Sequence, residues 1–184
     1  MGRISGRGNS EENATVVTRL IPAMNFSCNV TIVSWIISAN RNRQTGTLMP
    51  KIQIWRENGS LPDVYHKVNS AIAVNESVCF DDQSTPLFRN RVFLCILKDT
   101  ARVSVQPGDI LGLEIPPTND DVFDIHFTNE GLVNYVFQQQ LSYTVDLSNN
   151  DSEEREQPLI SLQVSTGNFL HWRCVCFWII IMLF

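Results

Sequence analysis

The stretch Arg102–Pro117, RVSVQPGDILGLEIPP, contains a tight turn between two apolar runs. Pro107 presets the backbone for the turn, Gly108 relieves its steric crowding, and Asp109 can bond to nearby backbone. Gly112 lies in the middle of the second run, where a glycine indicates a bulge or a close neighbour. The stretch therefore predicts two strands joined by a turn, and it carries scaffold rather than chemistry.

Similar short runs, rich in Val, Ile, Phe and Thr and separated by turn residues, continue from Thr18 to Val164. No apolar run keeps a helical period for three turns. The ten expected strands span residues 26–38, 51–56, 64–68, 77–80, 91–97, 101–105, 110–115, 122–128, 134–138 and 159–164. This pattern predicts an all-β fold, an antiparallel β-sandwich of jelly-roll type.

An immunoglobulin-like sandwich is the alternative fold. Cys28 and Cys95 are 67 residues apart, and Phe93 precedes Cys95 by two, where such domains often have Tyr. Trp35, however, is too close to Cys28 to lie on the next strand. About 70 residues follow Cys95 in the domain, where an immunoglobulin domain needs one strand. We therefore favour the jelly-roll topology.

The chain divides into three parts. We expect a flexible leader at residues 1–17, the sandwich ectodomain at 18–164, and a linker with a short apolar tail at 165–184. The uninterrupted apolar part of the tail is 11 residues long. As a helix it spans about 16 Å, against about 30 Å for the hydrocarbon core of a membrane. We interpret the tail as a truncated membrane segment, an anchor signal or a mispredicted exon. We expect membrane association through this tail or through a missing segment.

Composition limits the classes of function. The chain has 184 residues, of which 43% are hydrophobic and 18% charged, so one domain can bury a substantial core. The net charge of −5 gives no positive field to hold nucleic acid. Five cysteines are too few for a disulfide-dense scaffold, and their spacing does not match paired zinc ligands. We expect no nucleic-acid partner and no cofactor.

Acceptor triplets for N-glycosylation indicate the compartment. Chance would place roughly two Asn-x-Ser/Thr triplets in a chain of this composition. There are six, starting at Asn13, Asn25, Asn29, Asn58, Asn75 and Asn150. We therefore expect an extracellular or cell-surface protein. The first residues lack the apolar run of a secretion signal, so we expect a domain cut from a longer precursor or an incomplete gene model.

Two of the acceptor triplets lie on either side of Cys28 in Met24–Trp35, MNFSCNVTIVSW. In a strand, alternate side chains point to opposite faces. Asn25 and Asn29 then share the polar face with Trp35, and Cys28 turns toward the core. This spacing favours a buried cysteine over an exposed nucleophile.

A disulfide is expected in an oxidising compartment. Cys79 and Cys95 enclose fifteen residues, and a bridge between them would stabilise the fold by about 3 kcal/mol in the chain-entropy model. We predict this pair because Cys28 is expected in the core. A bond between Cys28 and Cys95 stays open.

Catalytic patterns are weak. His126 lies two residues from Asp124 on an expected solvated face, with no serine or cysteine motif near it. The strand pattern brings no pair of carboxylates together, as a glycan-processing hydrolase requires. Asn119-Asp120-Asp121 does not match the EF-hand spacing, and we interpret it as a turn rather than a calcium site. We therefore expect no enzyme and no metal site, with the hydrolase as the least favoured alternative.

Aromatic side chains are the candidate binding residues. A lectin would use exposed rings such as Trp35, Trp55 or Tyr65 to stack on sugars. Ile52 and Ile54 share one face of their strand, so the ring of Trp55 points the other way. Trp55 is therefore the candidate ligand contact. We expect a recognition or adhesion domain with an unknown protein or glycan ligand, and a lectin-like module as the alternative.

Four ordered motifs give a resemblance. They are TRLIPAMNFSC, PKIQIWR, RVSVQPGDILGLEIPPTNDD and NYVFQQQLS. Over roughly residues 18–164, the chain resembles an uncharacterised extracellular domain of predicted sponge cell-surface proteins. The resemblance implies a glycosylated ectodomain that stands ahead of other extracellular modules and a membrane anchor. It implies no activity, ligand or binding residue.

Overall fold

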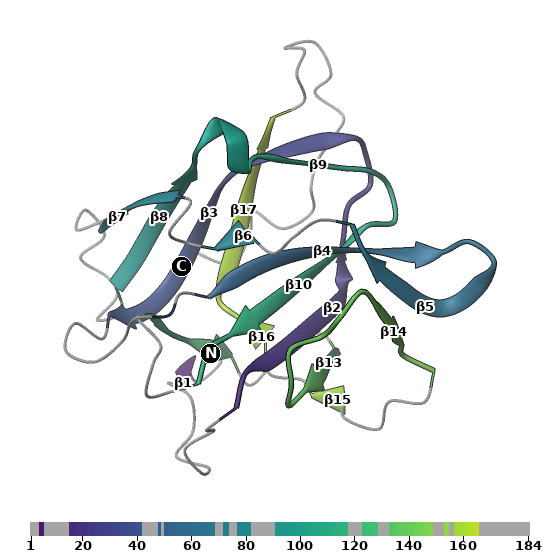
Figure 1. Cartoon of the computed structure of the whole chain (residues 1–184). Helices are drawn as coiled ribbons and strands as arrows, with labels where there is room; N and C mark the ends of the chain where they lie inside the picture. The colour runs from purple at the N-terminus through teal and green to yellow at the C-terminus, as the bar shows by residue number, and fades with distance from the viewer. Residues whose placement is uncertain are drawn as a thin grey trace.

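The structure is a computed structural model. It describes residues 4–5, 15–41, 48, 50–68, 72–73, 77–81, 91–117, 123–128, 133–148, 153–154 and 157–165. Every strand pairing among these residues is antiparallel. Helical structure within them is limited to the 3-10 turn Asp99–Ala101. The predicted all-β antiparallel sandwich is confirmed (Figure 1).

The larger sheet has eight strands in the order β14-β5-β4-β10-β2-β13-β15, with β6 paired to β4. Its centre is β10 (Ile110–Ile115), between β2 (Val17–Asn25) and β4 (Lys51–Asn58). Its outer strands are β5 (Leu61–Lys67), β6 (Ile72–Ala73), β13 (Asn134–Phe137), β14 (Thr144–Asp146) and β15 (Glu153–Glu154). All residues of β10 are buried, as expected for a strand covered on both faces.

The second sheet has six strands in the order β11-β3-β8-β7, with β9 and β17 also paired to β3. Its strands are β3 (Val30–Arg41), β7 (Ser77–Asp81), β8 (Arg91–Leu97), β9 (Val103–Val105), β11 (Phe123–Ile125) and β17 (Ile160–Ser165). The 12-residue β3 pairs with four of the other strands. It therefore organises this sheet.

A small third sheet joins β1 (Ile4–Ser5), β12 (Phe127–Thr128) and β16 (Gln157–Pro158). Strand β1 falls in the segment predicted as a flexible leader, and it pairs with β12. These two residues therefore join the folded domain. The tail from residue 166 onward lies outside the described residues.

The main core lies between the two large sheets. Ile52 and Ile54 of β4 and Leu111 of β10 pack in one cluster with Trp35 and Phe93 from the facing sheet. Each of these side chains is at most 2% exposed. Burial of one such side chain stabilises the fold by about 1.5–3 kcal/mol, so this cluster holds the sandwich together.

A bulge in β3 reverses the face on which its apolar residues lie. The register with β17 pairs Gln163 with Ser34 and Val164 with Ile32, so Val33 has no partner in this ladder. Because side chains alternate along a strand, skipping one residue moves the following ones to the other face. Trp35 therefore points into the core and is 0% exposed, and its predicted place on the polar face is wrong.

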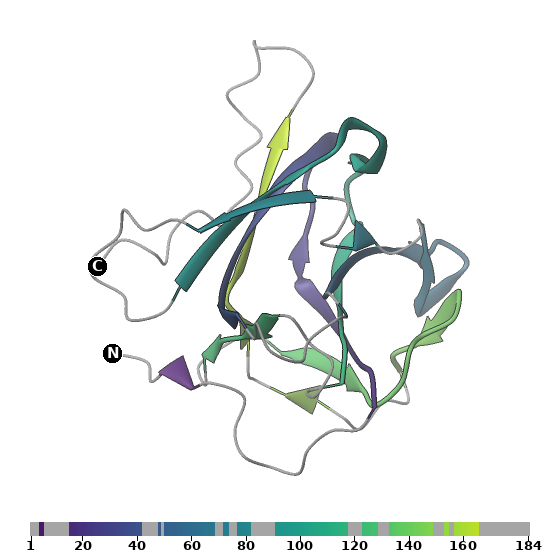
Figure 2. The ribbon, with the colours of Figure 1, turned by 60° about the vertical axis from the view of Figure 1, so that its left-hand side comes forward.

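A second apolar cluster covers the outer face of the larger sheet. It contains Leu20, Trp55, Ile110, Leu141, Val145 and Leu147. Strand β13 pairs with β2 and β14 pairs with β5, so the short connection between β13 and β14 runs from one side of the sheet to the other. The sheet curls around this cluster (Figure 2). The outer face is thereby buried as well.

Trp55 fills the centre of this outer cluster. It points away from Ile52 and Ile54, as predicted, but its exposed fraction is 0%. A Cβ atom built on Gly112 would lie 2.7 Å from Trp55 Nε1, so the predicted close neighbour of Gly112 is this ring. The prediction that Trp55 is exposed for ligand contact is wrong, because the connection after β13 covers it.

Candidate functional site

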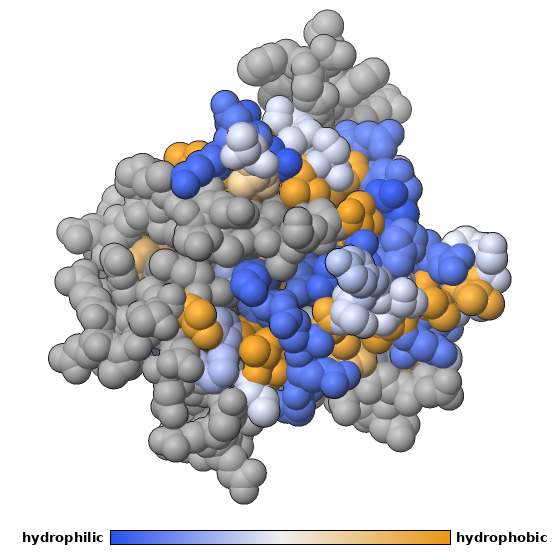
Figure 3. All heavy atoms as spheres, viewed as in Figure 1, coloured by the Kyte–Doolittle hydropathy of each residue, from blue (hydrophilic) through white to orange (hydrophobic). Residues whose placement is uncertain are grey.

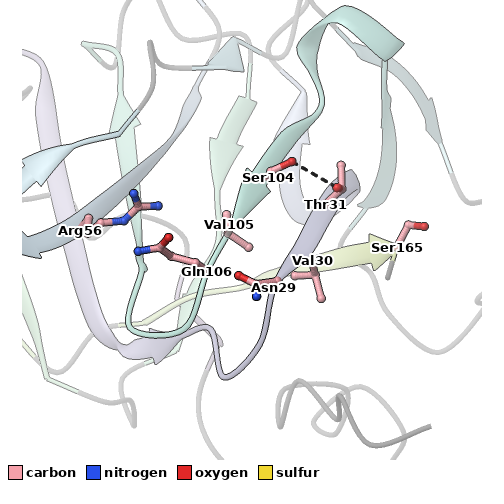
Figure 4. Close-up of a pocket in the computed structure, with 8 residues that line it drawn as sticks. All are labelled: Asn29, Val30, Thr31, Arg56, Ser104, Val105, Gln106 and Ser165. Carbon is pink, nitrogen blue, oxygen red and sulfur yellow. Dashed lines mark hydrogen bonds between the residues drawn. The ribbon is translucent and has the colours of Figure 1, made fainter. Parts of the chain in front are cut away.

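A pocket of about 360 Å³ lies beside the start of β3. Its lining comes from β3, β4, β9, β17 and the flanking turns (Figure 4). The lining residues are Asn29, Val30, Thr31, Arg56, Ser104, Val105, Gln106 and Ser165. The volume is near the lower end of the roughly 300–1,000 Å³ range of small-molecule sites.

The strand register builds one wall of this pocket. Thr31 of β3 lies between Ser104 of β9 and Ser165 of β17. The hydroxyl oxygens of Thr31 and Ser104 are 3.4 Å apart. Because side chains alternate, the next residues on the same side are Asn29 and Gln106, whose neighbours Val30 and Val105 pair directly. The wall is therefore a row of hydroxyl and amide groups.

The other wall is an ion pair. Arg56 donates to both carboxylate oxygens of Asp109, through Nε at 2.7 Å and a terminal nitrogen at 2.9 Å. The Asp109 side chain is fully buried, whereas that of Arg56 is 32% exposed. The hydrogen bond to Asp109 raises the pKa of Arg56, with a smaller opposing effect of burial. The guanidinium is therefore charged, is paired with Asp109, and belongs to a residue that lines the pocket.

The turn predicted from PGD positions Asp109 for this pair. Gly108 has a φ of 87°, a left-handed conformation that glycine adopts without strain. Asp109 also accepts a hydrogen bond from the backbone N–H of Gln106 at 2.9 Å. The tight turn thus contributes to the pocket as well as to the scaffold.

Three of the predicted glycosylation sites fall on described residues. Asn25 and Asn29 are exposed and Asn58 is half-buried at the end of β4. Asn58 accepts a hydrogen bond from the backbone N–H of Ser60 in the turn to β5. The other three predicted sites, Asn13, Asn75 and Asn150, lie outside the described residues. Each described acceptor asparagine is therefore reachable at least in part.

Cys28 is less buried than predicted. It is half-buried at the rim of the main core. Cys95 pairs with Trp35 along β3, seven residues from Cys28, or about 23 Å of extended strand. A disulfide needs Cα atoms within about 7 Å, so this register disfavours the open alternative of a bond between Cys28 and Cys95.

The register between strands β7 and β8 bears on the predicted Cys79–Cys95 disulfide. The two residues lie directly opposite each other on β7 and β8. Cross-strand partners have Cβ atoms about 4.5–5.5 Å apart, close to the separation that a disulfide requires. We expect non-reducing peptide mapping to give a fragment that joins Cys79 to Cys95. A fragment that joins Cys95 to any other cysteine would contradict the prediction.

His126 was predicted on a solvated face, and this prediction is wrong. The residue is buried, and its exposed fraction is 2%. Its Nδ1 is 3.0 Å from the hydroxyl of Ser38, and its backbone N–H donates to the Ser38 carbonyl. Ser38 is itself only 3% exposed. A substrate does not reach this serine–histidine pair, which holds the end of β3 to the β11–β12 segment.

A buried polar network around Glu114 was not predicted. Its carboxylate accepts hydrogen bonds from Lys51 Nζ at 2.8 Å and Gln53 Nε2 at 2.7 Å. Gln53 in turn accepts a bond from Trp55 Nε1 at 3.0 Å. Burial lowers the pKa of Lys67, which lies over the Trp55 ring. These groups satisfy one another, so we assign the network to stability of the outer face.

Among the residues that the structure describes, one aromatic ring is largely exposed. Tyr143, just before β14, is 80% exposed, whereas Trp35 and Trp55 are buried and Tyr65 is half-buried. Apolar and hydrophilic residues are interspersed over the described part of the face in Figure 3. Tyr143 therefore replaces Trp55 as the candidate for stacking on a ligand.

No cluster of His, Cys, Asp or Glu suited to a metal ion occurs in the part of the chain that the structure describes. The acidic stretch 119–121 lies outside it. Within the same residues, no helix is long and apolar enough to cross a membrane.

The fold and the pocket define an antiparallel β-sandwich with a polar, hydrogen-bonding pocket at one end of β3, the strand that organises the six-stranded sheet. No protein-family model, no curated protein and no solved structure matches this chain.

Proposed function

We propose that this chain is a non-enzymatic recognition or adhesion domain of a glycosylated extracellular or cell-surface protein. The position of the acceptor asparagines supports this most directly. Asn25 and Asn29 are exposed and Asn58 is half-buried, so these three acceptor side chains are at least partly reachable. A bulky, polar glycan belongs on the surface. The resemblance to sponge ectodomains favours the same compartment.

The chemistry of the pocket favours binding over catalysis. Its side chains are hydroxyls, amides and a guanidinium that already pairs with Asp109. Such groups form hydrogen bonds with neutral polar ligands and carry no activated nucleophile. A carbohydrate-binding module is the second candidate, favoured by this lining and by exposed Tyr143. A glycan array that gives no signal would remove it.

Expression with a heterologous secretion signal in a glycosylating cell is the direct test. We expect a secreted protein whose intact mass falls on enzymatic removal of N-glycans, because the acceptor asparagines are accessible. Variants N25Q, N29Q and N58Q assign the mass to individual sites. Secretion of a chain whose mass does not change would contradict the proposed compartment.

A further inference from the structure

We propose that the first N-acetylglucosamine of a glycan on Asn29 occupies the pocket beside β3 as an intramolecular ligand. The inference rests on the proposed function, because N-glycans are added in the secretory pathway. It goes further by stating which sugar the pocket takes and where that sugar comes from.

The position of Asn29 supports this occupant. Its side chain lies on the pocket wall, with the amide directed toward the side of Gln106 (Figure 4). In the transfer reaction, the amide nitrogen bonds to the anomeric carbon of a lipid-diphosphate-linked sugar. The bond from that carbon to phosphate oxygen breaks, the lipid diphosphate leaves with the electron pair, and the amide gives up one proton. The sugar is thereby attached at the edge of the cavity.

The lining matches an N-acetylated sugar. Ser104, Gln106 and Arg56 offer hydroxyl, amide and guanidinium groups that pair with ring hydroxyls and the acetamide. Val30 and Val105 also border the pocket, but they belong to the main core cluster, so the contacts to the sugar are polar. A covalently attached sugar also has a high effective concentration, so weak individual contacts suffice to hold it.

Asn25 is the natural control. It is exposed like Asn29 and belongs to an acceptor triplet only four positions earlier. Asn25, however, pairs with Ile110 at the end of β2 and is not among the pocket residues. The two sites therefore differ in whether a glycan meets the cavity.

Thermal unfolding of defined glycoforms of the full chain tests the proposal. We expect trimming with an endoglycosidase that leaves one sugar to keep the Tm unchanged. The N29Q variant should melt roughly 2–4 °C lower, the shift for loss of a few weak contacts in a domain of this size. The N25Q variant should have the same Tm as the wild type. Unglycosylated wild type and N29Q, made in bacteria, should melt together, which removes any effect of the substitution itself.

A double-mutant cycle with Gln106 locates the contact. The side chain of Gln106 is exposed, so Q106A should lower the Tm of the glycosylated protein and leave that of N29Q unchanged. A glycan on Asn29 without these effects would overturn the inference and leave the proposed function standing. An unmodified Asn29 beside a glycosylated Asn25 or Asn58 would do the same. Absence of glycan from every site would overturn both.

Discussion

Replacing Gly112 with valine is expected to destabilise the domain by about 3 kcal/mol or more, at the upper end of the range for overpacked cores. A Cβ at this position would lie 2.7 Å from Trp55 Nε1 and 3.0 Å from Leu20 Cδ2. The Trp55 ring cannot move outward, because Leu141 and Val145 pack in the same cluster. Relief therefore requires the ring to leave its place and to lose its hydrogen bond to Gln53.

Urea unfolding followed by circular dichroism measures this effect. Gly59→Ala is the matched control, because a Cβ built on Gly59 meets nothing within 4 Å. We expect the control to unfold close to the wild type and G112V at a much lower urea concentration. Equal midpoints for G112V and G59A would mean that Trp55 does not lie against Gly112.

The strands with clear turn chemistry at their ends were predictable from sequence. The expected ranges 91–97 and 110–115 coincide with β8 and β10, and 51–56 covers most of β4. Strand β2 was missed because Pro22 interrupts its pattern, and prolines usually mark edges or bulges. Its register with β10 is indeed irregular there, since Ile110 pairs with Asn25 and Leu111 with Ile21.

Errors at the candidate site arise from burial by distant segments. Trp55 was assigned to the correct face, but that face is covered by Leu141 and its neighbours. His126 is buried against Ser38, 88 positions away in the chain. The alternation of side chains along a strand predicts which residues share a face. It does not predict which segments of the chain cover that face. The ion pair between Arg56 and Asp109 joins β4 to a turn 53 positions later, and no local sequence pattern predicts this contact.

The ion pair between Arg56 and Asp109 gives the second large expected effect. Replacing one partner should cost more stability than replacing the other. We expect Arg56→Gln to cost about 3–5 kcal/mol, because it leaves a buried carboxylate without its charged partner. Asp109 is fully buried and keeps the N–H of Gln106. Asp109→Asn should cost less, because the remaining guanidinium is 32% exposed and can keep part of its hydration.

Urea unfolding of both variants, with Arg56→Lys beside them, decides the point. Lysine retains the positive charge but not the two-point geometry that arginine offers a carboxylate, so R56K should fall between the wild type and R56Q. We expect the unfolding midpoints to decrease in the order wild type, R56K, R56Q, with D109N above R56Q. If D109N were less stable than R56Q, the cost would come from lost contacts of the PGD turn, through the N–H of Gln106, and not from an unpaired buried charge. The order of the two single variants therefore reports whether charge burial or turn geometry dominates at this wall of the pocket.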